Sequence, residues 1–203
     1  MEIEAVIFDF GGVLLRTEDR APRATLAQEL GMTYERIEQL VYYSPSGKKA
    51  ALGLISADDH WEEVGRYLNL SPGKLKEFRR RFFDGDRLDE ELLNCIRSLQ
   101  NSYQTALLSN AWGDLRGYLE NSWRIADAFD EIVISAEVGL AKPDARIYTL
   151  LLKRLDVEPR GALFVDDSIE NIEAANQIGM PTIHFDRPDK VLPELQRLLK
   201  ATQ

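Results

Sequence analysis

The stretch AVIFDFGGV, residues 5–13, decides the fold of this 203-residue chain. A short apolar run ends in Asp9, and Gly11 and Gly12 follow, which is typical of a buried strand that leads into a tight turn. Four more short apolar runs end in polar or small residues: TALLSN (105–110), EIVIS (131–135), ALFVDD (162–167) and PTIHF (181–185). Helical patterns separate these runs, so the sequence predicts an α/β fold with a parallel sheet.

Residues 16–85 interrupt this alternation. Helical signatures follow one another there without a convincing strand, and Ser56 with Asp59 matches a capping box at a helix start. We therefore predict an all-helical cap at residues 16–85. It would be inserted into a Rossmann-like core of residues 1–15 and 86–203, with helices on both faces of the sheet. Within the cap, YSPSGKK (43–49) is expected to form a loop.

Composition and charge argue against several kinds of partner. The chain is 44% hydrophobic and has 25 Lys and Arg against 34 Asp and Glu, a net charge of -9. Such a chain folds around a core and is poorly suited to bind a polyanion, so no nucleic-acid partner is expected. No apolar stretch approaches the ~20 residues that span a bilayer. The first residues are acidic where a signal peptide is basic, so no membrane association is expected either.

The single cysteine, Cys95, lies in an apolar helical stretch and cannot form an internal disulfide. We expect a reduced core thiol and a cytoplasmic location. The oligomeric state stays open.

Reactive side chains gather where the parallel strands are expected to end, or in the loop before a helix. These residues are Asp9, Ser109, Asn110, Lys142, Asp166 and Asp167. In open parallel sheets, ligands bind outside the carboxyl ends of the strands. Three carboxylates that converge there repel one another unless a cation binds, and all-oxygen ligation suits Mg²⁺. With a lysine and a hydroxyl, this set suffices for phosphoryl transfer.

Four ordered motifs resemble those of the haloacid dehalogenase (HAD) superfamily of hydrolases: DFGGV (9–13), LSN (108–110), KPD (142–144) and VDDS (165–168) with Asn171. The predicted cap also lies where that family has a helical cap, so the resemblance covers nearly the whole chain. It implies an Mg²⁺-dependent phosphatase that acts on a small phosphorylated metabolite, a sugar phosphate being one candidate.

The resemblance also implies roles for individual residues. Asp9 would attack phosphorus and become an aspartyl phosphate. Lys142 would neutralise the phosphoryl group and orient Asp9. Ser109 and the backbone N–H of Asn110 would bind the phosphoryl group. Asn171 would organise the loop.

The metal ligands implied by the resemblance are the Asp9 carboxylate, the backbone carbonyl of Gly11 and the Asp167 carboxylate. Asp166 would either bind the metal directly or contact a group that binds it.

One residue departs from the family pattern. Most phosphatases of the family have an aspartate two residues after the nucleophile, where this chain has Gly11. That aspartate protonates the leaving group and then activates water, and such acid–base help is worth roughly 10² to 10⁴ in rate. We therefore expect slow turnover of ordinary phosphomonoesters or a restriction to good leaving groups. Family members that resemble sugar-1-phosphatases also have glycine here.

Three alternatives stay open. A 2-haloacid dehalogenase has the same motif order, but it needs no metal and so has no use for the Asp166–Asp167 pair. A phosphonatase requires a cap lysine, for which Lys48 and Lys49 are the loop candidates. A regulatory or binding protein on a retired catalytic fold fits Gly11, but it would have been free to lose the acidic residues.

Other residues are expected to be mainly structural. His60 and His184 fit buried or strand positions better than catalytic ones. The run from Arg79 to Arg81 fits the solvated face of a helix. Trp112 fits a pocket wall and a packing position equally well. Four basic residues of the cap are candidates to close over an anionic substrate: Arg16, Arg20, Lys48 and Lys49.

Overall fold

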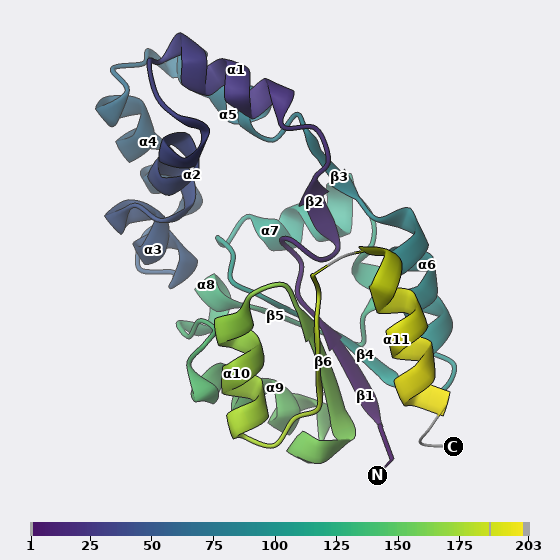
Figure 1. Ribbon diagram of the computed structural model, residues 1–203. Coiled ribbons are helices and arrows are strands. Elements are labelled where there is room, and N and C mark those ends of the chain that lie inside the picture. The colour runs from purple at the N-terminus through teal and green to yellow at the C-terminus, as the bar shows by residue number, and fades with distance from the viewer. Residues whose placement is uncertain (1, 187, 201–203) are drawn as a thin grey trace.

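The computed structural model describes residues 2–186 and 188–200. Its main sheet is parallel and has the strand order β5-β4-β1-β6-β7 (Figure 1). The strands are β1 (Ala5–Phe8), β4 (Gln104–Ser109), β5 (Glu131–Ile134), β6 (Ala162–Asp166) and β7 (Thr182–His184). All five apolar runs of the sequence are therefore strands of one sheet. The strand that precedes Asp9 lies at its centre.

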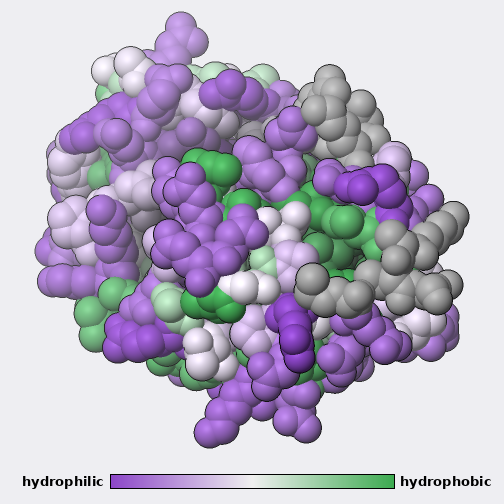
Figure 2. Space-filling view, turned by 60° about the horizontal axis from the view of Figure 1, so that its bottom comes forward, coloured by the Kyte–Doolittle hydropathy of each residue, from purple (hydrophilic) through white to green (hydrophobic). Residues whose placement is uncertain are grey.

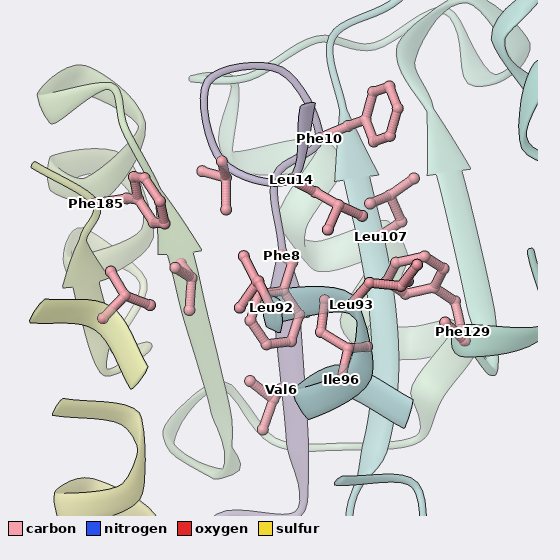
Figure 3. Close-up of a cluster of buried hydrophobic side chains, with 14 of the residues drawn as sticks. Val6, Phe8, Phe10, Leu14, Leu92, Leu93, Ile96, Leu107, Phe129 and Phe185 are labelled. Carbon is pink, nitrogen blue, oxygen red and sulfur yellow. The ribbon is translucent and has the colours of Figure 1, made fainter. Parts of the chain in front are cut away.

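Side chains of β1 alternate between the two faces of the sheet, as the pleat of a strand requires. Val6 and Phe8 pack with Leu92, Leu93 and Ile96 of α6 (Glu90–Leu99), as Figure 3 shows. Ala5 and Ile7 point to the opposite face, into a second buried cluster with residues of α9 (Ala145–Leu155) and α10 (Ile169–Gln177). Helix α11 (Pro188–Lys200) joins α6 on the first face. The sheet is therefore covered on both sides, as predicted.

Short elements also lie between the strands of the main sheet. They are α7 (Leu115–Gly117), a π-helix (Tyr118–Ser122), a 3₁₀ turn (Ala126–Ala128), α8 (Ser135–Val138) and a second 3₁₀ turn (Pro159–Gly161). Of these, α8 directly follows β5 and contacts the cap described next.

Five helices form the cap, which lies beyond the carboxyl edge of the sheet (Figure 1). They are α1 (Ala21–Glu29), α2 (Tyr34–Tyr42), α3 (Pro45–Ala51), α4 (Ala57–Tyr67) and α5 (Pro72–Phe82). The predicted capping box is present at α4, where Ser56 and Asp59 bond reciprocally. Large apolar side chains such as Ile37, Trp61 and Phe82 build a hydrophobic cluster within the cap. The division of the chain into two domains at residues 15/16 and 85/86 stays a prediction.

Two expectations for residues 16–85 are wrong. Residues 45–51 form α3 instead of a loop, because the Ser44 side chain accepts a hydrogen bond from Gly47 N and Pro45 occupies the first turn. A short strand also enters this region: β2 (Leu15–Thr17) pairs antiparallel with β3 (Asp86–Leu88). This two-stranded ribbon carries the chain from the sheet to the cap and back.

The face seen in Figure 2 is covered mainly by hydrophilic side chains, with small hydrophobic areas between them. Among the described residues, no helix is both long enough and apolar enough to cross a membrane. Cys95 is half-buried at the edge of the core, and burial raises the pKa of its thiol above the ordinary value.

Candidate active site

Asp9 follows the central strand directly and is buried, with 7% of its surface exposed. Its backbone N–H donates to Val165 O at 2.9 Å, so the strand pairing with β6 continues up to this residue. Its Oδ1 accepts a hydrogen bond from Phe10 N at 2.7 Å. The backbone on both sides therefore fixes the carboxylate at the carboxyl edge of the sheet.

Lys142 reaches this carboxylate from the loop before α9. Its Nζ lies 2.7 Å from Asp9 Oδ1 and 2.6 Å from Asp166 Oδ2, and only 1% of its side chain is exposed. Burial alone would lower the pKa of Lys142, but the charges of Asp9 and Asp166 outweigh it and raise this pKa above the ordinary value. The ammonium group therefore stays charged between the two carboxylates.

The pKa of Asp9 is shifted in the direction expected for a carboxylate out of water. Burial, with repulsion from Asp166 and Asp167, raises it from 3.8 to about 7 against the attraction of Lys142. Burial and the charge of Asp166 also raise the pKa of Asp167. One ammonium group does not balance this acidic cluster, so further positive charge would stabilise its ionised form.

Asp166 is the best-held carboxylate of the cluster. It ends β6 with no exposed surface and accepts hydrogen bonds from Ser168 N at 2.8 Å and from Asn171 Nδ2 at 3.0 and 3.1 Å. Asn171 lies in the first turn of α10 and is itself buried. With Lys142 added, both oxygens of Asp166 are engaged. This residue fixes the loop after β6 and the position of the lysine.

Asp167 is exposed at the edge of the cluster and lies against the turn after β1. A Cβ built on Gly12, whose φ is +83°, would lie 2.1 Å from Asp167 Oδ2. Only glycine therefore allows the two loops to approach this closely. One oxygen each from Asp9, Asp166 and Asp167 lies within 4.8 Å of the others. Three carboxylates at this spacing are a donor set that fits a hard cation such as Mg²⁺.

Gly11 lies in the same turn, but no side chain would be crowded there. A Cβ built on Gly11 meets nothing within 4 Å. The structure therefore has open space at the position where the sequence departs from the family pattern.

Ser109 ends β4 next to the central strand and is buried, with 2% of its surface exposed. The side chain of Asn110 has a place that the sequence did not predict. Its Nδ2 donates to Lys142 O at 2.8 Å, and its Oδ1 accepts from Lys142 N at 2.8 Å. The amide therefore holds the backbone of the lysine loop. A polar side chain one residue after the strand end was the only sequence signal for this pairing.

Two of the four basic candidates of the cap contact other side chains. Arg16 Nη1 binds Asp89 Oδ2 at 2.7 Å beside the β2–β3 ribbon, and the Arg20 guanidinium lies 4.0 Å from the centre of the Tyr34 ring. Lys48 and Lys49 are exposed on α3.

The expectation that Arg79 belongs to a solvated face is wrong, because its Nη2 binds Asp114 Oδ2 at 2.6 Å. The two histidines, for which the sequence predicts structural roles, each lie within hydrogen-bond distance of a protein oxygen. His60 is fully buried in the cap, with Nδ1 2.9 Å from Ser46 Oγ. His184 Nε2 lies 3.0 Å from the backbone oxygen of Asp167.

Fold and site together define a class of enzyme: a parallel α/β core with a helical cap and an acidic centre, closed by a buried lysine, at the carboxyl edge of the central strands. The chain belongs to the haloacid dehalogenase-like hydrolase family, whose model matches residues 3–179. It is a hydrolase of that family.

Relatives of known name match the chain over its length. A sesquiterpene phosphatase of Aspergillus oryzae is 27% identical over 201 residues, which cover 97% of this chain and 96% of the relative. A D-ribitol-5-phosphate phosphatase of Bacteroides thetaiotaomicron is 28% identical over 210 residues, which cover 98% of this chain and 100% of the relative.

Solved structures share the fold. A predicted HAD-like hydrolase from Porphyromonas gingivalis superposes with a TM-score of 0.80 at 23% identity, covering 98% of this chain and 99% of that one. A HAD family enzyme from Bacteroides thetaiotaomicron, in complex with magnesium and inorganic phosphate, superposes with a TM-score of 0.75 at 21% identity, covering 90% and 93%.

Proposed function

We propose that this protein is an Mg²⁺-dependent phosphatase that hydrolyses a small phosphorylated metabolite through an aspartyl phosphate on Asp9. The observation that carries the proposal is the cluster of Asp9, Asp166 and Asp167 within 4.8 Å, with Lys142 Nζ 2.7 Å from the first and 2.6 Å from the second. The full-length match to two relatives named as phosphatases supports it. A sugar or polyol phosphate is one candidate substrate.

The residues divide between the metal and the phosphoryl group. Asp9, Asp167 and the backbone carbonyl of Gly11 would hold Mg²⁺, with Asp166 beside them. When bound, Mg²⁺ supplies positive charge that offsets the repulsion between the carboxylates and an incoming phosphate. The HAD family enzyme crystallised with magnesium and inorganic phosphate supports the choice of ion.

Ser109, the backbone N–H of Asn110 and the Lys142 ammonium would hold the phosphoryl oxygens. Ser109 ends the strand beside β1, so it reaches the same edge as Asp9. The two hydrogen bonds between the Asn110 side chain and the Lys142 backbone keep the hydroxyl and the ammonium in a fixed relation. Such preorganisation is where most of the rate gain of phosphoryl transfer arises.

The reaction has two displacements at phosphorus. In the first, an oxygen of Asp9 forms a bond to phosphorus as the bond between phosphorus and the leaving oxygen of the substrate breaks. The leaving oxygen takes a proton from water or from another group of the substrate. In the second, a water oxygen forms a bond to phosphorus as the bond between phosphorus and the Asp9 oxygen breaks. The water gives a proton to solvent or to a phosphoryl oxygen, and inorganic phosphate and the Asp9 carboxylate are released. Lys142 orients the Asp9 carboxylate for the first step and faces the phosphoryl charge in both.

Gly11 offers no acid or base for either proton transfer. Substrates with good leaving groups, or with a hydroxyl that can supply the proton, are therefore expected to turn over fastest.

The acidic cluster also favours phosphoryl transfer over dehalogenation. A dehalogenase carries out its displacement at carbon without a metal. A carboxylate such as Asp167, whose pKa is raised by burial and by the charge of Asp166, would serve no purpose there. The phosphonatase alternative requires a lysine at the reaction centre, and Lys48 and Lys49 are exposed on α3.

Phosphate release from a panel of phosphorylated metabolites, with Mg²⁺ and with EDTA, tests the proposal. We expect release that requires Mg²⁺ and is abolished in Asp9→Asn. Equal activity in EDTA would contradict the metal role. Halide release from 2-haloacids without phosphate release would favour the dehalogenase, and phosphate-ester binding without turnover would favour the regulatory protein.

A further inference from the structure

Residues 109–114, which begin with the last residue of β4, form a short connector between the proposed phosphoryl site and the cap. Ser109, the last residue of β4, is one of the proposed phosphoryl ligands, and the Asn110 side chain holds the Lys142 backbone. Ala111 N donates to Ser135 Oγ at 3.0 Å, and Ser135 Oγ in turn donates to Ala51 O of the cap at 2.5 Å. Residues 109–111 therefore lead from the site to two consecutive hydrogen bonds, the second of which ends on α3.

Trp112 extends from this connector into the cap. Its Nε1 donates to Gly47 O of α3 at 3.3 Å. Its ring lies 4.7 Å from that of His60, 5.5 Å from that of Trp61 and 6.2 Å from that of Tyr42, measured between centroids. Trp112 thus packs against the hydrophobic cluster of the cap although it belongs to the β4 side of the chain.

Two further contacts surround this tryptophan. Asp114, at the end of the connector, binds Arg79 of α5 at 2.6 Å. Gly53, just after α3, approaches the core so closely that a Cβ would lie 2.1 Å from Ala136 O of α8. The cap is therefore joined to the core by the β2–β3 ribbon and also rests on the core through α3 and α5 around Trp112.

We propose that Trp112 is a positioning residue that seats the cap over the phosphoryl site, and that this seat sets the space for the part of the substrate beyond the phosphate. The inference rests on the proposed function, because it assigns the cap a substrate to enclose. Its physical basis is that one partly buried aromatic side chain packed among several rings, with its N–H hydrogen-bonded, fixes both the distance and the orientation between two units. The core alone still binds the phosphoryl group.

A substrate pair separates this role from general support of the core. Acetyl phosphate has only a small acyl group beyond its phosphate, whereas p-nitrophenyl phosphate carries an aromatic ring. In Trp112→Ala we expect the KM for p-nitrophenyl phosphate to rise roughly tenfold, while kcat for acetyl phosphate falls less than about threefold. In Trp112→Phe, which keeps a ring and loses the bond to Gly47 O, we expect an increase in KM of about fivefold or less.

Matched variants provide the controls. Trp123→Phe changes a tryptophan whose ring partners, Phe10 and Tyr118, are both outside the cap. Arg79→Ala breaks the contact with Asp114, whereas Arg81→Ala, on the same helix, breaks a pair with Glu29 inside the cap. We expect Arg79→Ala to raise the KM for p-nitrophenyl phosphate. The two controls, Trp123→Phe and Arg81→Ala, should leave this KM unchanged.

A measurement independent of activity keeps the two proposals apart. Amide hydrogen exchange at residues 47–53 of the cap and 135–139 of the core should become roughly tenfold faster in Trp112→Ala, with the strands β1 and β6 unchanged. This result would support the role of Trp112 in positioning the cap even if no phosphate ester were hydrolysed. In that case only the proposed function fails. Unchanged exchange at residues 47–53, or an equal loss of activity toward both substrates, would overturn the inference. If Trp112→Ala does not fold, Trp112→Leu, which removes the ring and its N–H but keeps an apolar side chain, is measured in its place, with the same expected and contradicting results.

Discussion

Asp9, Lys142 and Asp166 form a buried row in which one ammonium lies between two carboxylates. The sequence predicted that these residues would meet, because Asp9 and Asp166 end parallel strands and strand ends share one edge of a sheet. The resemblance implied that Asn171 organises the loop, but the sequence did not predict which atoms hold the row. The hydrogen bonds from Asn171 to Asp166 and from Asn110 to the lysine backbone depend on loop conformations that no residue pattern encodes.

The raised pKa of Asp9 predicts a gain in stability when its charge is removed. Its folded-state pKa of about 7 lies above the ordinary value of 3.8, so ionisation destabilises the metal-free fold increasingly as pH rises from about 4 to about 7. In EDTA at pH 8, we expect the Tm of Asp9→Asn to exceed that of the wild type by roughly a few degrees. At pH 4 the difference should vanish. A lower Tm for the variant at pH 8 would contradict this account.

The contact between Gly12 and Asp167 predicts a loss of metal affinity. In Gly12→Ala, a methyl group at positive φ would overlap the Asp167 carboxylate and displace it. We expect isothermal titration calorimetry to show Mg²⁺ binding weakened at least about tenfold. Gly31→Ala, a control in the cap that also has positive φ but open space for its methyl group, should change the affinity less than about threefold. Equal effects of the two variants would show that the close approach does not place Asp167.

At the scale of elements, the five strands and most helices followed from apolar runs and from start signals such as Ser56 with Asp59. Helix α3 does not follow from the sequence, because Ser44, Pro45 and Gly47 are residue types that favour a turn. Serine before proline also starts helices, and here the Ser44 side chain accepts from Gly47 N. Strand β2 was missed because its three residues gain their stability from pairing with β3, which is distant in sequence.

Two loops are joined through the Asn110 side chain, and this predicts a defect in phosphate binding. Asn110→Ala removes both hydrogen bonds to the Lys142 backbone and leaves those groups without their partner. We expect KM to rise about tenfold or more, with a smaller change in kcat, in steady-state kinetics with acetyl phosphate. Asn101→Ala, which removes one bond to Ser98 O on the surface, is the control. Wild-type kinetics in Asn110→Ala would show that the lysine loop is held by other contacts.

At the scale of the whole molecule, charge is divided unevenly. Residues 16–85 hold 12 Lys and Arg against 11 Asp and Glu, so 13 against 23 remain for the rest of the chain. A segment with such an excess of acid is unfavourable for a phosphorylated substrate until a cation binds. The contacts by which Trp112 positions the cap could not be predicted from the sequence. The partners of Trp112 come from α2, α3 and α4 and meet only in the folded protein.

The same excess of acid predicts that Mg²⁺ stabilises the fold. Binding to the folded state alone raises Tm, and an Mg²⁺ concentration 100 times the Kd is worth about 2.7 kcal/mol. Differential scanning fluorimetry should therefore show a higher Tm with Mg²⁺ than with EDTA. Most of this shift should be lost in Asp167→Asn. A shift of the same size in that variant would place the cation elsewhere.

The most direct test of the central claim is rapid-quench mass spectrometry of the protein during turnover of acetyl phosphate with Mg²⁺. Our account predicts a phosphoryl group on the peptide that contains Asp9, formed before phosphate is released and absent in Asp9→Asn. Phosphate release without a phosphorylated protein, or a phosphoryl group on another residue, would contradict it.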